Sequence, residues 1–326
     1  CSVLPRQHSV VLLNFDYHSH LIAAVPTPIT LQDHILALPA SAHWAVQRIK
    51  IHGSIQDIVD AIKNGTASTV SDGSYKLKLG TSGFILITPD GQSYIQGVNR
   101  VPGPLKDGDS YRCELAGLYG ILIVVQALAK SHNITGGKCV IACDNDAAIR
   151  VCKPGFIPEP GADSFDLVNA IHLLLKQSPI TWIATEVDGH KDRHTSNLTF
   201  LEQLNVRMDK LAKAYWFYLS QQASTWETDY SIPIYGEGWQ LWNGNTKIRH
   251  ASRNNLYAII QDPITINYWV RHKRISSEAS YLIDWEASGR ALSSMKLGKR
   301  KRVSKHASHD CGVGTTLVKW NLQDDA

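Results

Sequence analysis

The chain has 326 residues and a formal net charge of +4, and 44% of its residues are hydrophobic while 19% are charged. This mixture is typical of globular proteins and excludes wholesale disorder, and the length predicts about two domains. The longest apolar run, Gly120 to Ala129, contains Gln126 and is too short to cross a bilayer, so we expect no membrane partner. Because the chain starts with Cys1 and not with Met, we expect it to be a piece of a longer polypeptide.

The charge is unevenly distributed along the chain. Between Arg271 and Lys305 there are ten Lys or Arg residues and three acids, a local excess of +7 that leaves about −3 for the rest. A basic tail on a near-neutral body favours a polyanionic partner, most simply nucleic acid, although a solvated tail fits equally well. The run from Lys299 to Arg302 resembles a nuclear localisation signal, and non-specific phosphate binding explains it at least as well. We expect an intracellular protein, either cytoplasmic or nuclear.

The six cysteines do not have the spacing of a secreted disulfide framework. Cys139 and Cys143 lie four residues apart on one predicted strand, which separates them by roughly 13 Å and excludes a shared metal or disulfide. Small buried side chains in a reducing compartment are the simpler interpretation.

The residue pattern divides the chain into three parts. Residues 1–66 are mixed, with short helices expected at Leu31–Leu38 and Ser54–Ile62 and no chemical motif. Residues 67–220 show regular strand-like and helix-like patterns. Residues 221–326 contain several Trp residues, with the basic tail near their end. We therefore expect an N-terminal segment, a central domain and a Trp-containing C-terminal region.

The central region alternates between strand-like and helix-like periodicity. Three runs rich in β-branched and apolar residues, two of them joined by Pro89-Asp90-Gly91, predict an antiparallel meander, and Leu115, Leu118 and Leu122 mark a helical face. The predicted strands are Thr69–Leu77, Ser82–Thr88, Ser93–Asn99, Lys138–Cys143 and Ile180–Val187. The predicted helices are Ser110–Lys130, a short one ending near Val151, Ser164–Gln177 and Thr199–Ser220. This order predicts an α/β domain with a mixed sheet.

Four acids occupy informative positions: Asp72 in the middle of the first strand, Glu114 at the start of the long helix, Asp144 at the end of the fourth strand, and Asp209 in the last helix. A carboxylate on an apolar strand is costly unless it is paired or bound to a cation. Several together would repel one another unless a metal compensated them, and oxygen ligands suit Mg²⁺. For any one of these acids, a helix cap or a surface position is the simpler interpretation.

Five short motifs follow one another on elements of the appropriate type. They are Asp72-Gly73-Ser74, Arg112-x-Glu114-Leu115, Asp144-Asn145, Gly189-His190 and Met208-Asp209-x-Leu211-Ala212. Together, between about Thr66 and Ser220, they resemble the ribonuclease H family. The segments Ser71–Tyr75 and Glu114–Gly120 look like the ribonuclease H segment of retroelement reverse transcriptases. The resemblance implies a ribonuclease H-like five-stranded mixed sheet, an antiparallel meander plus parallel strands, flanked by helices.

For chemistry, the resemblance implies two-metal hydrolysis of the RNA strand of an RNA/DNA hybrid, with two Mg²⁺ ions for which Mn²⁺ can substitute. Asp72 would bridge both ions, with Glu114 and Asp144 on one side and Asp209 on the other. His190 would assist proton movement or product release, although by itself it is a solvated loop histidine. In such polyproteins the segment follows a polymerase, so residues 1–66 would be the connection from a polymerase domain, which is an expected partner beside the hybrid.

The resemblance also suggests which residues contact nucleic acid: Gly73, Ser74, Ser110, Tyr111, Arg112 and Asn145. The sequence departs from the family here, since many members carry Asn or Gln where this chain has Ser110, Tyr111 and Asp146. Such amides sense the 2′-hydroxyl groups that distinguish RNA from DNA. Hybrid specificity therefore has less support from the sequence than hydrolysis has.

Two alternatives compete with this interpretation. An integrase or transposase of the same fold usually relies on three acids, the last a Glu, and lacks an acid in the first helix, so Glu114 and Asp209 argue against it. A catalytically inactive nucleic-acid-binding or structural module of the ribonuclease H fold would usually have lost carboxylates, and all four are present.

Overall fold

The structure is a computed structural model that describes residues 10–14, 30–103, 108–222, 232–243, 246–272, 275–283, 291–299 and 301. The chain divides into two compact units, Cys1–Ile259 and Ile260–Ala326. All four acids singled out above lie in the first unit, which is described first.

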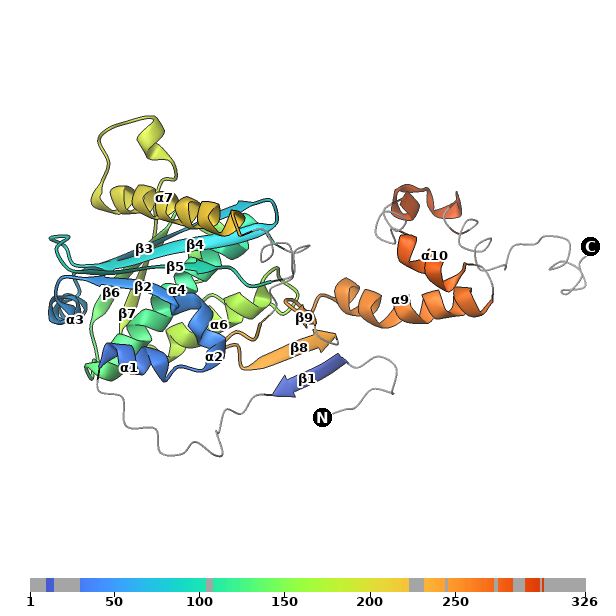
Figure 1. The fold of residues 1–326 in the computed structure, drawn as a ribbon, viewed down its shortest axis with the longest axis horizontal. Helices are drawn as coiled ribbons and strands as arrows, with labels where there is room; N and C mark the ends of the chain where they lie inside the picture. The colour runs from blue at the N-terminus through green and yellow to red at the C-terminus, as the bar shows by residue number, and fades with distance from the viewer. Residues whose placement is uncertain are drawn as a thin grey trace, which may run out of the picture. The chain divides into compact units, whose positions relative to one another are not determined.

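A six-stranded mixed sheet organises the first unit (Figure 1). Its strands, in spatial order, are β2 (Arg48–His52), β5 (Tyr94–Arg100), β4 (Leu79–Ile87), β3 (Ala67–Lys76), β6 (Lys138–Cys143) and β7 (Thr181–Glu186). The pairs from β2 to β3 are antiparallel, whereas β3, β6 and β7 are parallel. The predicted α/β arrangement, with a meander followed by parallel strands, is confirmed. The expectation of five strands missed the edge strand β2.

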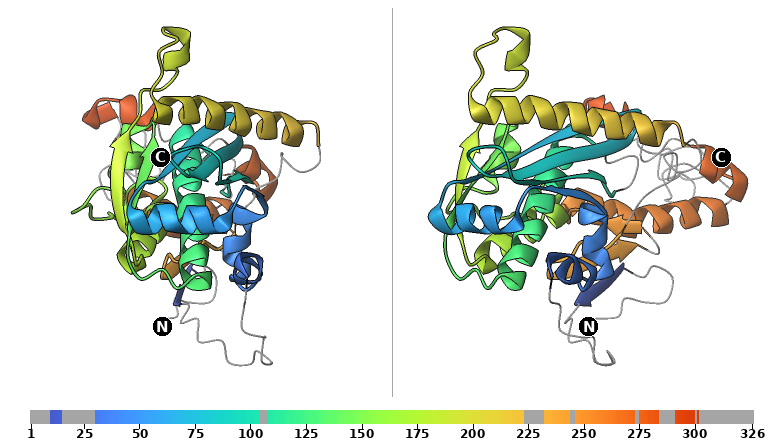
Figure 2. Two further views of the ribbon diagram at one scale, coloured as in Figure 1. Left: turned by 90° about the vertical axis from the view of Figure 1, so that its left-hand side faces the viewer. Right: turned by 60° about the vertical axis from the view of Figure 1, so that its left-hand side comes forward.

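Two long helices lie on opposite faces of this sheet (Figures 1 and 2). Helix α4 (Ser110–Ser131) packs on β3 and β4 from one side, and α7 (Phe200–Ser220) packs on the same strands from the other. Asp109 caps α4 by accepting a hydrogen bond from the backbone N–H of Arg112 at 2.7 Å. Nearly all of α4 beyond its first turn is buried, so it forms the centre of the main hydrophobic core.

Among the described residues, α4 is also the one helix with the length and apolar character of a membrane span. In this structure, however, 89% of its apolar window is buried by the rest of the fold. Burial as a core helix therefore accounts for that apolar character.

The remaining helices of the first unit are α1 (Leu31–Leu36), α2 (Ala40–Val46), α3 (Ile55–Asn64), α5 (Asp146–Arg150) and α6 (Phe165–Gln177). As predicted, Ser54 caps the start of α3, and its hydroxyl accepts a hydrogen bond from the N–H of Asp57. Helix α2 was not predicted. It places Trp44 against Tyr119 of α4, with ring centroids 5.2 Å apart and nearly parallel planes. The segment before residue 67 thus packs directly on the central helix.

A second sheet joins distant parts of the sequence. It consists of β1 (Val10–Asn14), β8 (Trp239–Asn243) and β9 (Thr246–Ile248), all antiparallel, in the order β1-β8-β9. Hydrogen bonds link the segment before β8 to the core, because the hydroxyl of Tyr119 donates to the carbonyl of Tyr235 at 2.9 Å. Residues on both sides of the central region are therefore built into the first unit.

A buried network of charged side chains holds α4, α6 and β9 together. Asp166, in the first turn of α6, accepts bonds from Arg112 at 2.7 and 2.9 Å and from Lys247 at 3.2 Å. Lys247 also pairs with Glu237 at 2.8 Å. Burial acts to raise the pKa of Asp166, but the neighbouring Arg112 and Lys247 charges prevail and hold it well below its usual range. The four side chains are all at most 5% exposed.

The second unit begins within α9 (Arg253–Arg271) and includes α10 (Ser277–Leu282). Ser276 caps α10 by accepting a hydrogen bond from the N–H of Ala279 at 3.0 Å. In the predicted basic run, Lys299 and Lys301 are exposed, while Arg300 and residues 302–326 lie outside the described residues.

Removing the charge of Asp166 tests the buried network. We expect Asp166→Asn to lower the free energy of unfolding by about 3–5 kcal/mol, because Arg112 would stay buried without its counter-ion and Lys247 would keep only Glu237. Urea denaturation measures this change. The matched control is Arg150→Ala, which breaks an ion pair whose partners are 59% and 53% exposed and should alter stability by less than about 1 kcal/mol. Similar losses of stability in Asp166→Asn and Arg150→Ala would contradict the stabilising role of the buried network.

Candidate metal centre

Three carboxylates from three different elements converge at one point. One oxygen each of Asp72, Glu114 and Asp144 lies within 4.8 Å of the others. Asp72 is 4% and Glu114 is 5% exposed, while Asp144 is half-buried. Their burial excludes the surface interpretation for Asp72 and Glu114, and the caps of the neighbouring helices are Asp109 and Asn145 instead.

The register of the sheet explains why two of these acids meet. Strands β3 and β6 are parallel neighbours, and Val70 is paired with Ala142. Side chains two residues further along point to the same face, which places Asp72 beside Asp144 at the carboxyl end of β6. This is also the face on which Val70 and Ala142 pack with Met208 of α7.

The third acid reaches the site because α4 approaches β3 unusually closely at Gly73. A Cβ atom at this position would lie 2.6 Å from the Cβ of Cys113 and 2.8 Å from the backbone nitrogen of Glu114. Any side chain on Gly73 would therefore push the start of α4 away from the strand. The glycine of the Asp-Gly-Ser motif thus fixes the position of Glu114.

Burial and mutual repulsion make this cluster unfavourable when all its members are ionised. Burial, followed by the charges of Asp144 and Asp209, raises the pKa of Asp72 to about 8. Burial, followed by the charges of Asp72 and Asp144, raises the pKa of Glu114 well above its usual range. A nearby cation would lower the pKa of both carboxyl groups again.

Two oxygens of the cluster also lack hydrogen-bond partners among the described residues. Within the described part of the chain, the buried Oδ2 of Asp72 and Oε2 of Glu114 accept no hydrogen bond. Orphaned buried carboxylate oxygens of this kind are costly unless a ligand satisfies them. An all-oxygen donor set fits a hard divalent cation such as Mg²⁺ or Mn²⁺. The residues present therefore suit a metal ion.

Helix α7 contributes a fourth acid and an amide to the surroundings of the cluster. Asp209 is 17% exposed and forms an ion pair with Lys213 at 2.7 Å, and its charge acts on Asp72. Asn205, one helical turn earlier, donates a hydrogen bond from Nδ2 to Oδ2 of Asp144 at 3.2 Å. Asn205 is 2% exposed and was not predicted from the sequence. Its position four residues before Asp209 is the signal that could have identified it.

The predicted Gly189-His190 motif lies beside the cluster on a polar loop. A Cβ atom at Gly189 would lie 2.6 Å from Oδ2 of Asp144, so the backbone passes directly over this carboxylate. His190 is exposed, with a left-handed φ of 54°. Lys191, next in the chain, forms ion pairs with Glu202 at 2.5 Å and with Asp188 at 3.2 Å. The loop is thereby tied to the first turn of α7.

The residues expected to contact nucleic acid differ in their accessibility. Ser110 is exposed, while Gly73, Ser74, Tyr111 and Asn145 are half-buried.

Arg112 requires a correction. Its side chain is 2% exposed and all three of its nitrogen groups donate to Asp166 or to the carbonyl of Pro102. It stabilises the core and does not face a ligand.

Asp146 is the acid that replaces an amide in the family pattern. It is 53% exposed and pairs with Arg150 at 2.9 Å and with Lys153 at 3.9 Å. Two cations thus offset the negative charge that this position brings near the cluster.

The described cysteines match the sequence-based interpretation. Cys113, Cys139, Cys143 and Cys152 are free and buried. Burial raises the pKa of each thiol, which keeps it protonated and chemically quiet.

A comparison with solved structures found ribonuclease H domains and enzymes among the similar chains. The N-terminal RNase H domain of a Mycobacterium tuberculosis protein, solved as a fusion with maltose-binding protein, has a TM-score of 0.34 and 13% identity over 48% of this chain and 97% of its own. RNase H1 of the halophilic archaeon Halobacterium salinarum has a TM-score of 0.31 and 16% identity, covering 45% and 94%. An RNase H1 isolated from compost by a metagenomic approach has a TM-score of 0.33 and 12% identity, covering 46% and 94%.

No family model matches the sequence, and no curated protein does. At TM-scores below 0.5 the site assignment rests on the carboxylate geometry itself.

The raised pKa of Asp72 predicts how pH affects the metal-free protein. The folded state binds a proton that the unfolded chain releases near 3.8, so stability should fall as pH rises from about 4 to about 8. Asp72→Asn should remove part of this loss and raise the Tm at pH 8 in EDTA, by about 2–4 °C for each kcal/mol relieved. Calorimetry at pH 5 and pH 8 measures both effects.

The control is Asp146→Asn, which removes an exposed charge and should leave the pH dependence as in the wild type. Adding Mg²⁺ or Mn²⁺ at pH 8 should stabilise the wild type and not Asp72→Asn, because the ion would bind only the folded, ionised cluster. A pH dependence that is identical in the wild type and Asp72→Asn would contradict this assignment.

Proposed function

We propose that the protein is a metal-dependent endonuclease that hydrolyses the RNA strand of an RNA/DNA hybrid. The observation that carries the proposal is the cluster of Asp72, Glu114 and Asp144, in which the unpartnered buried oxygens of Asp72 and Glu114 suit a cation. The sequence motifs that resemble ribonuclease H lie on the elements that build this cluster. The similar solved structures are of an RNase H domain and of RNase H1 enzymes, which agrees with this function.

The four acids would hold two divalent ions, Mg²⁺ or in its place Mn²⁺. Asp72, Glu114 and Asp144 would supply the ligand oxygens from the cluster, and Asp209 would supply one from helix α7. When bound, such ions lower the pKa of a water molecule and stabilise the negative charge that develops on the leaving 3′ oxygen. Asn205 orients Asp144 through its hydrogen bond. His190, on its exposed loop, would move a proton or aid product release.

The cellular setting is part of the same proposal. The likeness of Ser71–Tyr75 and Glu114–Gly120 to retroelement sequences supports a place in a reverse transcriptase polyprotein, with a polymerase domain as partner. In that setting residues 1–66 would be the connection, 67–220 the ribonuclease H-like domain and 221–326 the C-terminal region. The protein would then act inside the cell, in the cytoplasm or the nucleus.

Cleavage of a labelled RNA/DNA hybrid by the purified chain tests the proposal. In Mg²⁺ or Mn²⁺ we expect the RNA strand to be cut internally, and EDTA should abolish cutting. Asp144→Asn should lower the rate by at least about 100-fold, because it removes a ligand oxygen charge from the cluster. Gel electrophoresis of the products measures the rate.

Asp146→Asn is the matched control, two residues further along the chain and exposed, and it should retain nearly full activity. Single-stranded RNA, duplex RNA and duplex DNA should stay intact. Hybrid binding without any cutting, in both metals, would instead indicate an inactive binding module. Cutting of duplex DNA at the same rate would indicate another nuclease activity.

The role of His190 has its own signature. We expect His190→Ala to lower kcat by about 10- to 100-fold with little change in KM, because a histidine that moves a proton or aids product release acts on the rate of turnover and not on substrate binding. Steady-state kinetics separate the two constants, and His194→Ala serves as the control, being exposed on the same loop. An unchanged kcat in His190→Ala would remove His190 from the mechanism.

A further inference from the structure

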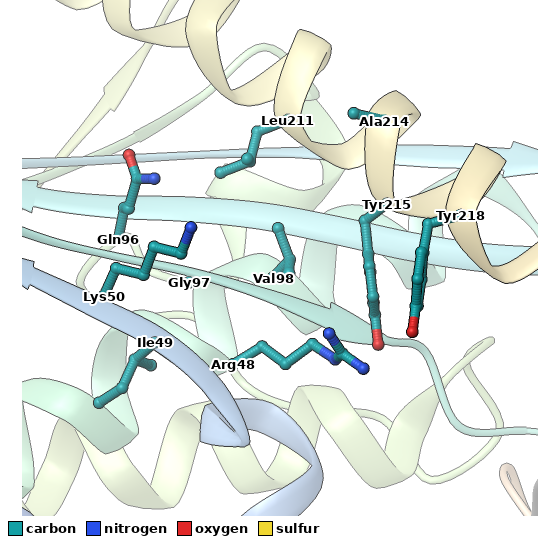
Figure 3. Close-up of a pocket in the computed structure, with 10 residues that line it drawn as sticks. All are labelled: Arg48, Ile49, Lys50, Gln96, Gly97, Val98, Leu211, Ala214, Tyr215 and Tyr218. Atoms are coloured by element: carbon teal, nitrogen blue, oxygen red, sulfur yellow. The ribbon is translucent and has the colours of Figure 1, made fainter.

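A groove of about 400 Å³ lies at the edge of the sheet, between α7 and the strands β2 and β5 (Figure 3). Its polar and aromatic lining consists of Arg48, Lys50, Gln96, Tyr215 and Tyr218. Strand β4 separates β5 from β3, which carries Asp72. The groove is therefore built from residues other than the carboxylates and can have its own ligand.

The cations of the groove come from the edge strand. Arg48 and Lys50 are two residues apart on β2, so their side chains project to the same face, and both are exposed. They lie opposite Val98 and Gln96 of β5. None of the described residues that line the groove is acidic. The groove thus presents uncompensated positive charge to a ligand.

Two tyrosines of α7 form the opposite wall. Tyr215 and Tyr218 are one helical turn apart, and their rings are stacked, with centroids 6.1 Å apart and planes 13° apart. The guanidinium carbon of Arg48 lies 5.3 and 5.1 Å from the two ring centroids, and Figure 3 shows it near the hydroxyl ends of both side chains. Tyr218 is 46% exposed. The exposed aromatic surface of Tyr218 therefore lies beside the positive charge of Arg48.

The same combination continues along the strands. Arg207 of α7 lies over the ring of Tyr94, 4.4 Å from its centroid, and donates a hydrogen bond to Gln96 at 2.5 Å. Tyr94 in turn stacks on His52, its partner across the β2–β5 pair, at 4.9 Å. Cationic and aromatic side chains therefore lie together near both ends of β2.

We propose that this strip binds an unpaired strand of nucleic acid without sequence preference. Arg48 and Lys50 would contact successive phosphates, and a base would stack on the exposed ring of Tyr218, the combination that single-strand-binding surfaces use. A groove of this volume admits one nucleotide, and stacking on Tyr218 requires an unpaired base, which a duplex does not offer. Charged edge strands also discourage pairing with other chains, but that purpose requires neither the stacked tyrosines nor Arg207.

This binding goes beyond the proposed cleavage and does not depend on it. The experiment uses the full chain in EDTA, which removes any metal-dependent contact at the carboxylates. Fluorescence anisotropy would measure the binding of labelled oligo-dT and oligo-rU. A length of about 16 nucleotides matches the upper end of the site sizes of single-strand-binding domains. Arg48→Glu combined with Lys50→Glu should weaken binding about tenfold and lower the slope of log K against log salt by about 1.4, as expected for two lost phosphate contacts.

The matched control is Lys130→Glu combined with Lys176→Glu, which makes the same change in net charge at exposed positions on α4 and α6. It should weaken binding less than twofold. Tyr218→Ala should weaken binding about fivefold or more and Tyr218→Trp should not, since tryptophan preserves stacking. Circular dichroism would confirm that each variant is folded.

A second measurement locates the contact on the wild-type chain. Oligonucleotides containing 5-iodouracil, irradiated in the complex, should cross-link to Tyr215 or Tyr218, as identified by mass spectrometry of the peptides. The proposal would be overturned if the Arg48/Lys50 and Lys130/Lys176 double variants weakened oligonucleotide binding equally. Cross-links confined to other parts of the chain would also overturn it. Comparable binding of oligo-dT and oligo-rU would show a surface for either strand, and binding of one alone would assign the strand. Hybrid cleavage that fails while this binding persists would contradict only the proposed nuclease function.

Discussion

The crowding of three carboxylates into one buried site is the constraint on which the rest of the structure depends. Taken separately, the sheet register, the glycine at position 73 and the backbone crossing at Gly189 are ordinary features. Together they force Asp72, Glu114 and Asp144 to within 4.8 Å of one another, against both desolvation and repulsion. Such an arrangement lowers the stability of the fold, so other interactions must compensate for it. This holds generally for sites whose geometry is formed before a ligand binds.

Much of that compensation comes from segments outside the central region. The buried charges around Asp166 connect α4 and α6 to β9, and the stacking of Trp44 on Tyr119 adds the N-terminal helices to the same core. Helix α4 is fixed both by the charges around Asp166 and by Trp44, so the position of Glu114 depends on residues far away in the sequence. The parts of the chain that lack any catalytic motif therefore have a structural role in the site.

Elements with strong periodicity could be predicted from the sequence, because local pattern and tertiary environment agree there. Strand Lys138–Cys143 occurs within its predicted bounds, and α4 differs by one residue. Strand β2 was missed because its alternation of Arg, Ile, Lys and Ile is short and mostly exposed. The pairing of Arg112 with Asp166 spans 54 residues, so a local motif could only suggest a surface role for that arginine. The four acids were found from their positions on the elements, whereas the roles of all site residues stay predictions.

The Glu202 side chain takes part in two structures at once. One of its oxygens accepts from the N–H of Thr199 in the capping box that starts α7, and the other accepts from Lys191 in the His190 loop. The loop and the first turn of the helix are consequently a single cooperative segment. If the loop swings away, Glu202 loses its ion pair with Lys191, the first turn of the helix is weakened, and fraying there would proceed toward Asn205 and Asp209. Motion of an exposed histidine and order at the carboxylate site are thus thermodynamically linked, so hydrogen exchange in the first turn of α7 would report on both.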